Sequence, residues 1–297
     1  MEERLIAIYG KGLEEESAPW VAAILERLRK AGIDLVCEEG FAERLRCILP
    51  EQTLFKGRFH AGNLADHRPE LLLSIGGDGT FLDSVLYVRE SRIPVLGLNT
   101  GRLGFLAAVS SAEAERAVQQ IIDRKYERRE RRLIRLKADG RDFPDFSYGL
   151  NEVGIHKTEN SSMLKIHAYI GEIYLTTYWA DGLVIATPTG STAYSLSGGG
   201  PIVNPECRNF ILTPVCPHNL AMRSLVVPDD VTIRLKVEGR AGEFTLSLDS
   251  RMRKMKDSTV VEVTAGEFGI EVAHLPEYNY YETLRNKLGW GEDKRNN

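Results

Sequence analysis

The decapeptide LLLSIGGDGT, residues 71–80, predicts a buried strand, a glycine-rich turn that carries one carboxylate, and the start of a helix. Residues 71–75 are apolar except for one serine, which is typical of a parallel strand covered on both faces. Thr80 and Asp83 have the spacing of a helix-capping pair, and apolar residues at helical spacing follow. The stretch therefore predicts one strand–turn–helix step of an α/β fold.

The turn after this strand is suited to binding a phosphate group. Its glycines, Gly76, Gly77 and Gly79, let the backbone come close to a ligand, and free N–H groups at a helix start favour anions. Asp78 would face a bound phosphate, which is repulsive unless the carboxylate handles a hydroxyl group or a metal ion. The alternative is a turn that needs glycine for its shape alone.

The composition is ordinary for a globular protein. The 297 residues are 43% hydrophobic and 27% charged, which suits two domains or one large one. A net charge of −4 gives no argument for binding nucleic acid or an anionic membrane. The sequence has no apolar run of membrane-spanning length and no secretory signal pattern. We therefore expect a cytoplasmic protein without nucleic-acid or membrane partners.

The cysteines and histidines show no metal-site spacing, so the sequence predicts no protein-held metal ion. The four cysteines are widely separated and are typical of reduced thiols: Cys37, Cys47, Cys207 and Cys216.

The apolar pattern changes after about residue 126. Before it, strands alternate with helices in the order βαβα, which implies a Rossmann-like parallel sheet with helices on both faces. After it, segments such as 164–170 and 231–237 alternate apolar with polar residues, as antiparallel strands do. A last helix is expected to pack back on the first domain. We predict an α/β domain at 1–126 with 276–297, and a mostly β domain at 127–275.

The segment Gly97–Leu106 follows a predicted strand but lacks the Gly-x-Gly-x-x-Gly pattern of an oxidoreductase. It is expected to form a loop at the carboxyl edge of the parallel sheet, where such folds bind ligands. The alternative is a tight structural turn.

Two segments of the predicted β domain carry further candidates. Asn151 beside Glu152 is a natural pair for hydrogen-bonding a ribose or an adenine edge, although a surface strand end is the alternative. In Asp181–Pro201 a short strand leads into hydroxyls and glycines, which suit a sugar or a heterocycle, and Tyr194 is placed to stack on a base. A serine nucleophile is the other interpretation, but Ser191 lies in no Gly-x-Ser-x-Gly elbow.

Together these segments resemble the NAD kinase family. The resemblance spans residues 71–223 and rests on segments that occur in the family's order: Gly76–Thr80, Gly97–Leu106, Asn151-Glu152, Asp181–Pro201 and Thr213–Arg223. Residues 38–69 match no motif. Asp249-Ser250-Arg251 departs from the Asp-Gly-Gln of many members, which bears on a local loop.

Three alternatives fit less well. Lipid kinases share the glycine–aspartate turn but carry a Pro-x-Gly-Thr-x-Asn-Asp type segment where this chain has Gly97–Leu106. Phosphofructokinases lack the segment Thr187–Tyr194. A dinucleotide sensor without catalytic activity would not need Asp78 and Glu152, because a carboxylate beside a phosphate only weakens binding.

The resemblance implies transfer of the γ-phosphoryl group of ATP to the 2′-hydroxyl of the adenosine ribose of NAD, giving NADP. It implies that Asp78 is catalytic, and that Mg²⁺ or another divalent metal ion enters with ATP. The implied phosphate-binding residues are Gly76, Gly77, Gly79 and Thr80. The implied NAD-binding residues are Asp78, Gly79, Asn151, Glu152, Asp181, Thr189, Thr192, Ala193, Tyr194 and Ser197. A homodimer or homotetramer is expected, because members of the family complete the site with a neighbouring subunit.

Overall fold

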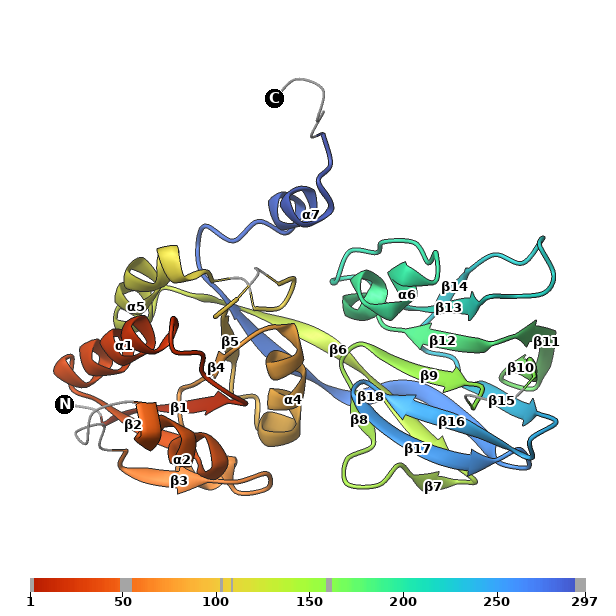
Figure 1. Ribbon diagram of the computed structural model, residues 1–297, viewed down its shortest axis with the longest axis horizontal. Coiled ribbons are helices and arrows are strands. Elements are labelled where there is room, and N and C mark those ends of the chain that lie inside the picture. The colour runs from red at the N-terminus through yellow and green to blue at the C-terminus, as the bar shows by residue number, and fades with distance from the viewer. Residues whose placement is uncertain (1–2, 49–54, 102–103, 108, 159–161, 292–297) are drawn as a thin grey trace. The chain divides into compact units, whose positions relative to one another are not determined.

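The computed structural model describes residues 3–48, 55–101, 104–107, 109–158 and 162–291 (Figure 1). The chain divides into two compact units, which we call the α/β unit (Met1–Arg129 with Ile270–Asn297) and the β unit (Glu130–Gly269). Two long strands, β6 (Glu127–Ala138) and β18 (Val260–His274), continue from one unit into the other. In the described ranges, no helix is long and apolar enough to span a membrane.

A parallel sheet forms the centre of the α/β unit, in the order β18-β5-β4-β1-β2-β3. The bounds of its first five strands are β1 Arg4–Gly10, β2 Ile33–Glu38, β3 Gly57–Phe59, β4 Leu71–Ile75 and β5 Val95–Leu98. Because β2 and β3 lie on one side of β1 and β4 and β5 on the other, the strand order reverses between β1 and β4. In open parallel sheets the carboxyl edge at such a reversal is where ligands bind.

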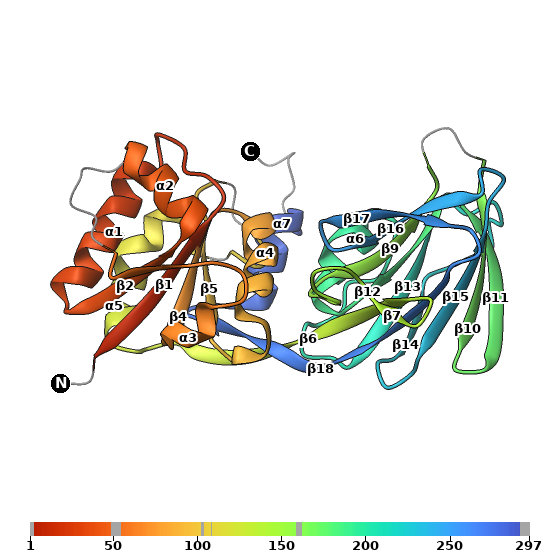
Figure 2. The same cartoon turned by 90° about the horizontal axis from the view of Figure 1, so that it is seen from below.

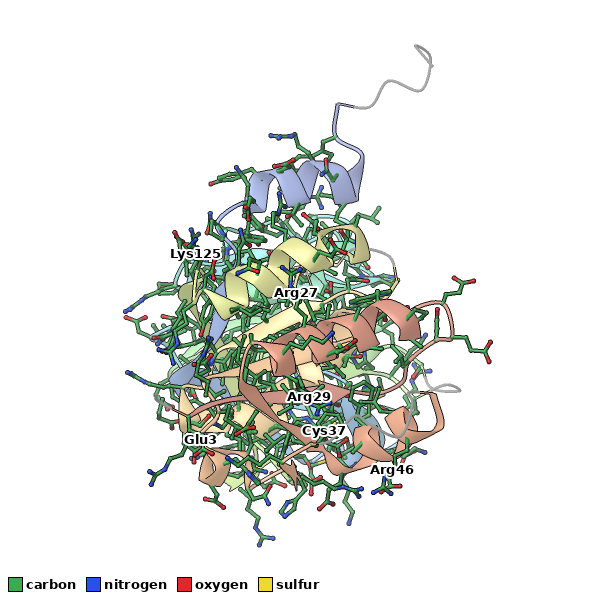
Figure 3. All side chains as sticks on the ribbon, turned by 90° about the vertical axis from the view of Figure 1, so that its left-hand side faces the viewer. Glu3, Arg27, Arg29, Cys37, Arg46 and Lys125 are labelled. Atoms are coloured by element: carbon green, nitrogen blue, oxygen red, sulfur yellow. The ribbon has the colours of Figure 1, made fainter. Side chains whose placement is uncertain are left out.

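The helices cover both faces of this sheet (Figure 2). They are α1 (Ala18–Lys30), α2 (Glu39–Ile48), α3 (Leu64–His67), α4 (Asp78–Val88), α5 (Ala114–Ile122) and α7 (Tyr280–Leu288), with short 3₁₀ turns η1 (Arg89–Ser91) and η2 (Ser111–Glu113). The apolar sides of α1, α2 and α5 share one buried cluster with the sheet. Arg27 of α1 also reaches α5, where its guanidinium donates to the Glu115 carbonyl at 3.3 Å and to the Gln119 side chain at 2.8 Å (Figure 3).

The last helix belongs to the α/β unit. Its N-cap, Asn279, accepts hydrogen bonds through its side chain from the N–H groups of Tyr281 and Glu282 at 3.0 and 3.2 Å. Gly289 ends the helix with a φ of 64°, in the left-handed region that suits glycine. The predicted return of the C-terminal helix to the first domain is therefore confirmed.

The β unit is built from two sheets that share one apolar core. One contains β11-β10-β15-β18, with β6 paired to β18, β7 and β8, and the other has the order β14-β13-β12-β9-β16-β17. The remaining bounds are β7 Arg141–Asp142, β8 Tyr148–Gly149, β9 Glu152–His156, β10 Leu164–Ile170, β11 Ile173–Ala180, β12 Gly182–Ala186, η3 Thr189–Thr192, α6 Tyr194–Ser197, β13 Asn209–Val215, β14 Leu225–Pro228, β15 Ile233–Glu238, β16 Glu243–Leu248 and β17 Arg251–Lys256. The predicted fold class, an α/β domain followed by a mostly β domain, is confirmed.

The predicted Thr80–Asp83 capping pair is wrong. Helix α4 begins three residues earlier than a Thr80 N-cap would imply, at Asp78, with Gly77 as its N-cap and no side-chain cap. The N–H groups of Thr80 and Phe81 therefore donate to the Gly77 carbonyl, at 3.0 and 3.1 Å. Asp83 instead forms an ion pair with Lys11.

Residues 38–69, which matched no sequence motif, carry α2, β3 and α3 in their described part, and residues 49–54 lie outside it.

Candidate active site

The glycine turn lies at the carboxyl end of β4, beside β1 and therefore at the reversal of strand order. Gly76 has a φ of 149°, and a Cβ there would collide with the Thr80 side chain, so the position requires glycine. Gly77 and Gly79 are exposed, and a Cβ on either would meet nothing within 4 Å. The turn is thus tightly packed at its first residue and open at the next two glycines.

The Asp78 carboxylate is held by three consecutive backbone N–H groups. Its Oδ2 accepts from Phe105 at 2.8 Å, and its Oδ1 accepts from Leu106 at 3.0 Å and Ala107 at 2.9 Å. These bonds fix the direction of the carboxylate. Each carboxylate oxygen has two lone pairs, so Oδ2 keeps one for a further donor such as a hydroxyl group.

The loop after β5 provides these three N–H groups. Gly104 lies against Asp78, and a Cβ at Gly104 would overlap the carboxyl group. Asn99, which is buried, braces the loop, because its side-chain amide donates to the Ala107 carbonyl at 3.2 Å and accepts from the Gly101 N–H at 2.8 Å. The predicted loop Gly97–Leu106 thus positions Asp78 through its backbone. Its residues Arg102 and Leu103 lie outside the described residues.

In the β unit, Asn151 and Glu152 stand at the start of β9 and are held in the same way. The carboxylate of Asp249 accepts from the N–H groups of Leu150 at 2.8 Å, Asn151 at 2.8 Å and Glu152 at 3.0 Å. The Asp249 N–H in turn donates to the Glu152 carbonyl at 2.9 Å. Sequence reasoning gave Asp249 no role, although it noted the Asp249-Ser250-Arg251 departure.

Glu152 is a strongly perturbed acid. Burial and, secondarily, the negative charge of Asp249 raise the pKa of Glu152 to about 8. Its Oε2 is buried and has no hydrogen-bond partner among the described residues. Such an orphaned polar atom is costly in a folded protein and indicates a site that a ligand completes.

The segment Asp181–Pro201 brings its hydroxyls beside Asn151 and Glu152. Strand β12 pairs with β9, with Ala186 opposite Glu152. The Thr187 N–H donates to the Asn151 carbonyl at 2.8 Å. A Cβ on Gly190 would collide with that same carbonyl, so the turn containing Thr189 packs directly on Asn151.

The other predicted NAD-binding residues lie on this segment. Thr189 is buried, and the Thr192 hydroxyl donates to its carbonyl at 3.4 Å. Ala193 is half-buried, Ser197 is exposed, and the Tyr194 ring is 44% exposed. The ring of Tyr194 also packs against the imidazole of His156, with the ring centres 5.7 Å apart. Tyr194 therefore presents an aromatic surface beside His156, at the end of β9 that pairs with Gly182.

Asp181 lies at the other end of β12 from Thr187, where its carboxylate pairs with Lys157 at 2.9 Å. At about 3.3 Å per residue, the six steps between Asp181 and Thr187 separate these positions by roughly 20 Å. Tyr194 of the Thr189–Ser197 group nevertheless contacts His156, which pairs with Gly182, the residue next to Asp181.

The serine-nucleophile alternative is wrong for Ser191. Its side chain is fully buried, and its hydroxyl both donates to the Val203 carbonyl at 3.1 Å and accepts from the Val203 N–H at 3.0 Å. A hydroxyl engaged in this way braces a loop and is not available to attack a substrate.

No group of three or more His, Cys, Asp and Glu side chains in the described ranges is arranged to hold a metal ion. A metal ion that enters as the nucleotide complex is bound mainly by phosphate oxygens and water and requires no protein cage.

Comparisons with known proteins show the family of this chain. The family model for the ATP-NAD kinase N-terminal domain matches residues 6–126, and that for the ATP-NAD kinase C-terminal domain matches residues 150–275. The chain is 43% identical to an NAD kinase of Cytophaga hutchinsonii, over 98% of this chain and 100% of that protein. It is 42% identical to one of Porphyromonas gingivalis, over 96% and 98% of the two chains.

Solved structures show the same fold. The crystal structure of yeast NADH kinase complexed with NADH matches with a TM-score of 0.84 and 22% identity, covering 98% of this chain and 89% of that one. An NAD kinase from Archaeoglobus fulgidus in complex with ATP matches with a TM-score of 0.68 and 21% identity, covering 96% and 97% of the two chains. The two family models and the relatives above 40% identity show that this chain belongs to the NAD kinase family, whose activity is the ATP-dependent phosphorylation of NAD.

Proposed function

We propose that Asp78 orients the 2′-hydroxyl of the adenosine ribose of NAD for attack on the γ-phosphorus of ATP. The observation that carries this role is the Asp78 carboxylate, which three N–H groups hold in place while Oδ2 keeps a lone pair for the hydroxyl. As the new O–P bond forms, the bond from the γ-phosphorus to the bridging oxygen breaks and ADP leaves. In a loose transition state the hydroxyl proton departs late, toward Asp78, so orientation matters more than basicity.

The phosphate groups of ATP would contact the open part of the glycine turn. The N–H groups of Gly76 and Thr80 donate to the Leu98 and Gly77 carbonyls, at 2.9 and 3.0 Å, and are occupied. The N–H groups of Gly77 and Gly79 are therefore assigned to the phosphates, since space around both residues is open. Mg²⁺ or another divalent ion would enter bound to ATP and neutralise the charge that develops on the phosphate oxygens.

The adenosine part of NAD is assigned to the β unit. Asn151 and Glu152 would bind ribose hydroxyls, because amide and carboxylate oxygens accept from them, and the exposed ring of Tyr194 would stack on adenine. The polar positions around them would complete the contacts: Thr189, Thr192, Ala193 and Ser197. Asp181 would contact the far end of the dinucleotide.

The stacking role predicts a specific effect of Tyr194 variants. Tyr194→Ala should raise KM for NAD roughly 5- to 150-fold, because stacking of a base on an aromatic ring contributes roughly 1–3 kcal/mol. Tyr194→Phe keeps the aromatic ring and should stay close to the wild-type KM. Steady-state kinetics at saturating Mg²⁺–ATP measure both. Equal KM values for the Ala and Phe variants would show that the ring does not carry NAD binding.

We further propose a cytoplasmic homodimer or homotetramer. The location is supported by the free thiols of Cys37, Cys207 and Cys216, since disulfides are rare in the cytoplasm. Association is supported by the edge strand β11, which exposes Ile173 and Trp179, because exposed large apolar side chains on a strand edge favour pairing with another chain.

A further inference from the structure

The buried carboxyl groups of Asp249 and Glu152 interact, and their hydrogen bonds differ sharply. Both oxygens of Asp249 face backbone N–H donors, three in all, from Leu150 to Glu152. Glu152 Oε2 has no partner among the described residues. N–H donors stabilise the ionised form of a carboxyl group, whereas burial without a partner stabilises the neutral form. Of the two groups, Asp249 is thus the one built to carry the negative charge.

The charges around the two carboxyl groups also favour an ionised Asp249 and a neutral Glu152. Burial raises the pKa of Asp249, but its three backbone N–H bonds and the positive charge of Arg251 oppose that rise. His156 lies at the other end of β9 from Glu152. Burial lowers the pKa of His156, so its imidazole supplies no positive charge at neutral pH. From β12, the residue opposite Glu152 is Ala186, which does not titrate. Asp249 is then the charged group that acts on Glu152.

We propose that Asp249 is a positioning residue for NAD, which fixes the backbone of Asn151 and Glu152 and keeps one proton on Glu152 until a ribose hydroxyl displaces it. This inference rests on the proposed role of Glu152 in NAD binding. A carboxylate accepts from a ribose hydroxyl in a stronger, charge-assisted hydrogen bond than a neutral carboxyl group does, so NAD binding favours the ionised form of Glu152 and the proton leaves the protein. The chemistry balances, because the proton passes to solvent and no bond of NAD is changed.

The release of a proton from Glu152 on NAD binding can be measured. With the pKa of Glu152 at about 8 in the free protein, the side chain is mostly protonated at pH 7, and this proton should leave on binding. NAD itself has no group that titrates near neutral pH. Because NAD selects the ionised form, its affinity should rise about tenfold per pH unit well below pH 8 and level off above that value.

The test is isothermal titration calorimetry of NAD into the full-length protein, without ATP, in buffers of different ionisation enthalpy between pH 6 and 9. The wild type should release close to one proton at pH 7. Glu152→Gln should abolish the release and weaken NAD binding roughly 10- to 100-fold. Glu172→Gln, a highly exposed carboxylate of the same unit, is the matched control and should behave as the wild type.

The variant Asp249→Asn tests whether Asp249 acts on the protonation of Glu152 or only stabilises the fold. An amide places an NH₂ group against at least one backbone N–H, so NAD binding should weaken by about tenfold or more. Loss of the Asp249 charge should also move the pH of half-maximal proton release down by roughly one unit. A purely structural role would weaken binding and leave that pH unchanged.

The outcomes distinguish the two proposals. If Glu152→Gln binds NAD as well as the wild type does, the assignment of Glu152 to the NAD site is wrong. If Glu152→Gln weakens binding but the wild type releases no proton, or takes one up, Glu152 belongs to the site and the proposed proton on Glu152 is contradicted. Should Asp249→Asn fail to fold, the wild-type and Glu152→Gln titrations still decide the question.

Discussion

Asp78→Asn is expected to lower kcat on the order of 10²- to 10⁴-fold, while NAD binding stays within about twofold of the wild type. Both oxygens of Asp78 accept backbone N–H groups, so an amide NH₂ must face a donor at one of them. The hydroxyl of NAD then loses both the acceptor and its fixed direction. Initial rates of NADP formation at saturating substrates give kcat, and calorimetry gives NAD affinity.

Asp66→Asn, at an exposed carboxylate of the same unit, is the control and should retain wild-type activity. A thermal melt should show both variants folded. An Asp78→Asn enzyme with kcat within tenfold of the wild type would refute the assignment of Asp78 as the group that orients the hydroxyl.

Gly104→Ala is expected to lower kcat roughly 10²-fold, with little change in KM for NAD. A Cβ at this position would overlap the Asp78 carboxyl group, so the carboxylate must rotate or the loop must shift. Either change removes Oδ1 or Oδ2 from its N–H donors in residues 105–107. Steady-state kinetics with NAD varied at saturating Mg²⁺–ATP separate kcat from KM.

Gly101→Ala provides the matched control within the same loop. A Cβ on Gly101 would meet only the Asn99 side-chain oxygen, at 4.0 Å, which is an ordinary contact. This variant should therefore keep wild-type kcat. Equal loss in the two variants would mean that the loop is generally sensitive to substitution and that close approach to Asp78 is not the cause.

Asp78 and Asp249 use the same device in two unrelated segments. Each carboxylate accepts three consecutive backbone N–H groups, from residues 105–107 and 150–152 respectively. Such a carboxylate holds a loop through the backbone N–H groups of the loop alone, and no side chain of the loop takes part. The consequence differs: Asp78 keeps a lone pair for substrate, whereas Asp249, fully buried, acts on its neighbour Glu152.

The local parts of the fold could be predicted from the sequence. The apolar run at 71–75 is strand β4, and the alternating segment 164–170 is strand β10, because burial on two faces or on one leaves a direct pattern in the residues. The Thr-x-x-Asp pattern predicts the wrong start for α4, since Gly77 caps this helix through backbone geometry that the pattern does not reveal. Patterns of neighbouring residues thus locate elements better than their ends.

The candidate site was harder to predict because its geometry depends on long-range hydrogen bonds. Asp78 and its donors are separated by 27 to 29 residues, and Asp249 and its donors by 97 to 99. Nothing in the local sequence around Asp249 marks it as the anchor of Asn151 and Glu152. In the structure Asp249 lies in the turn after β16 with a φ of 51°, a conformation that Asp tolerates better than most residues.

The most direct test of the account is a product analysis with the purified full-length protein, NAD and Mg²⁺–ATP, run beside Asp78→Asn. An NADP-specific dehydrogenase reports the product, since it responds only to a phosphate on the 2′-oxygen. The account predicts one NADP per ATP consumed by the wild type and almost none from the variant. ATP consumption without NADP, or undiminished NADP formation by Asp78→Asn, would contradict it.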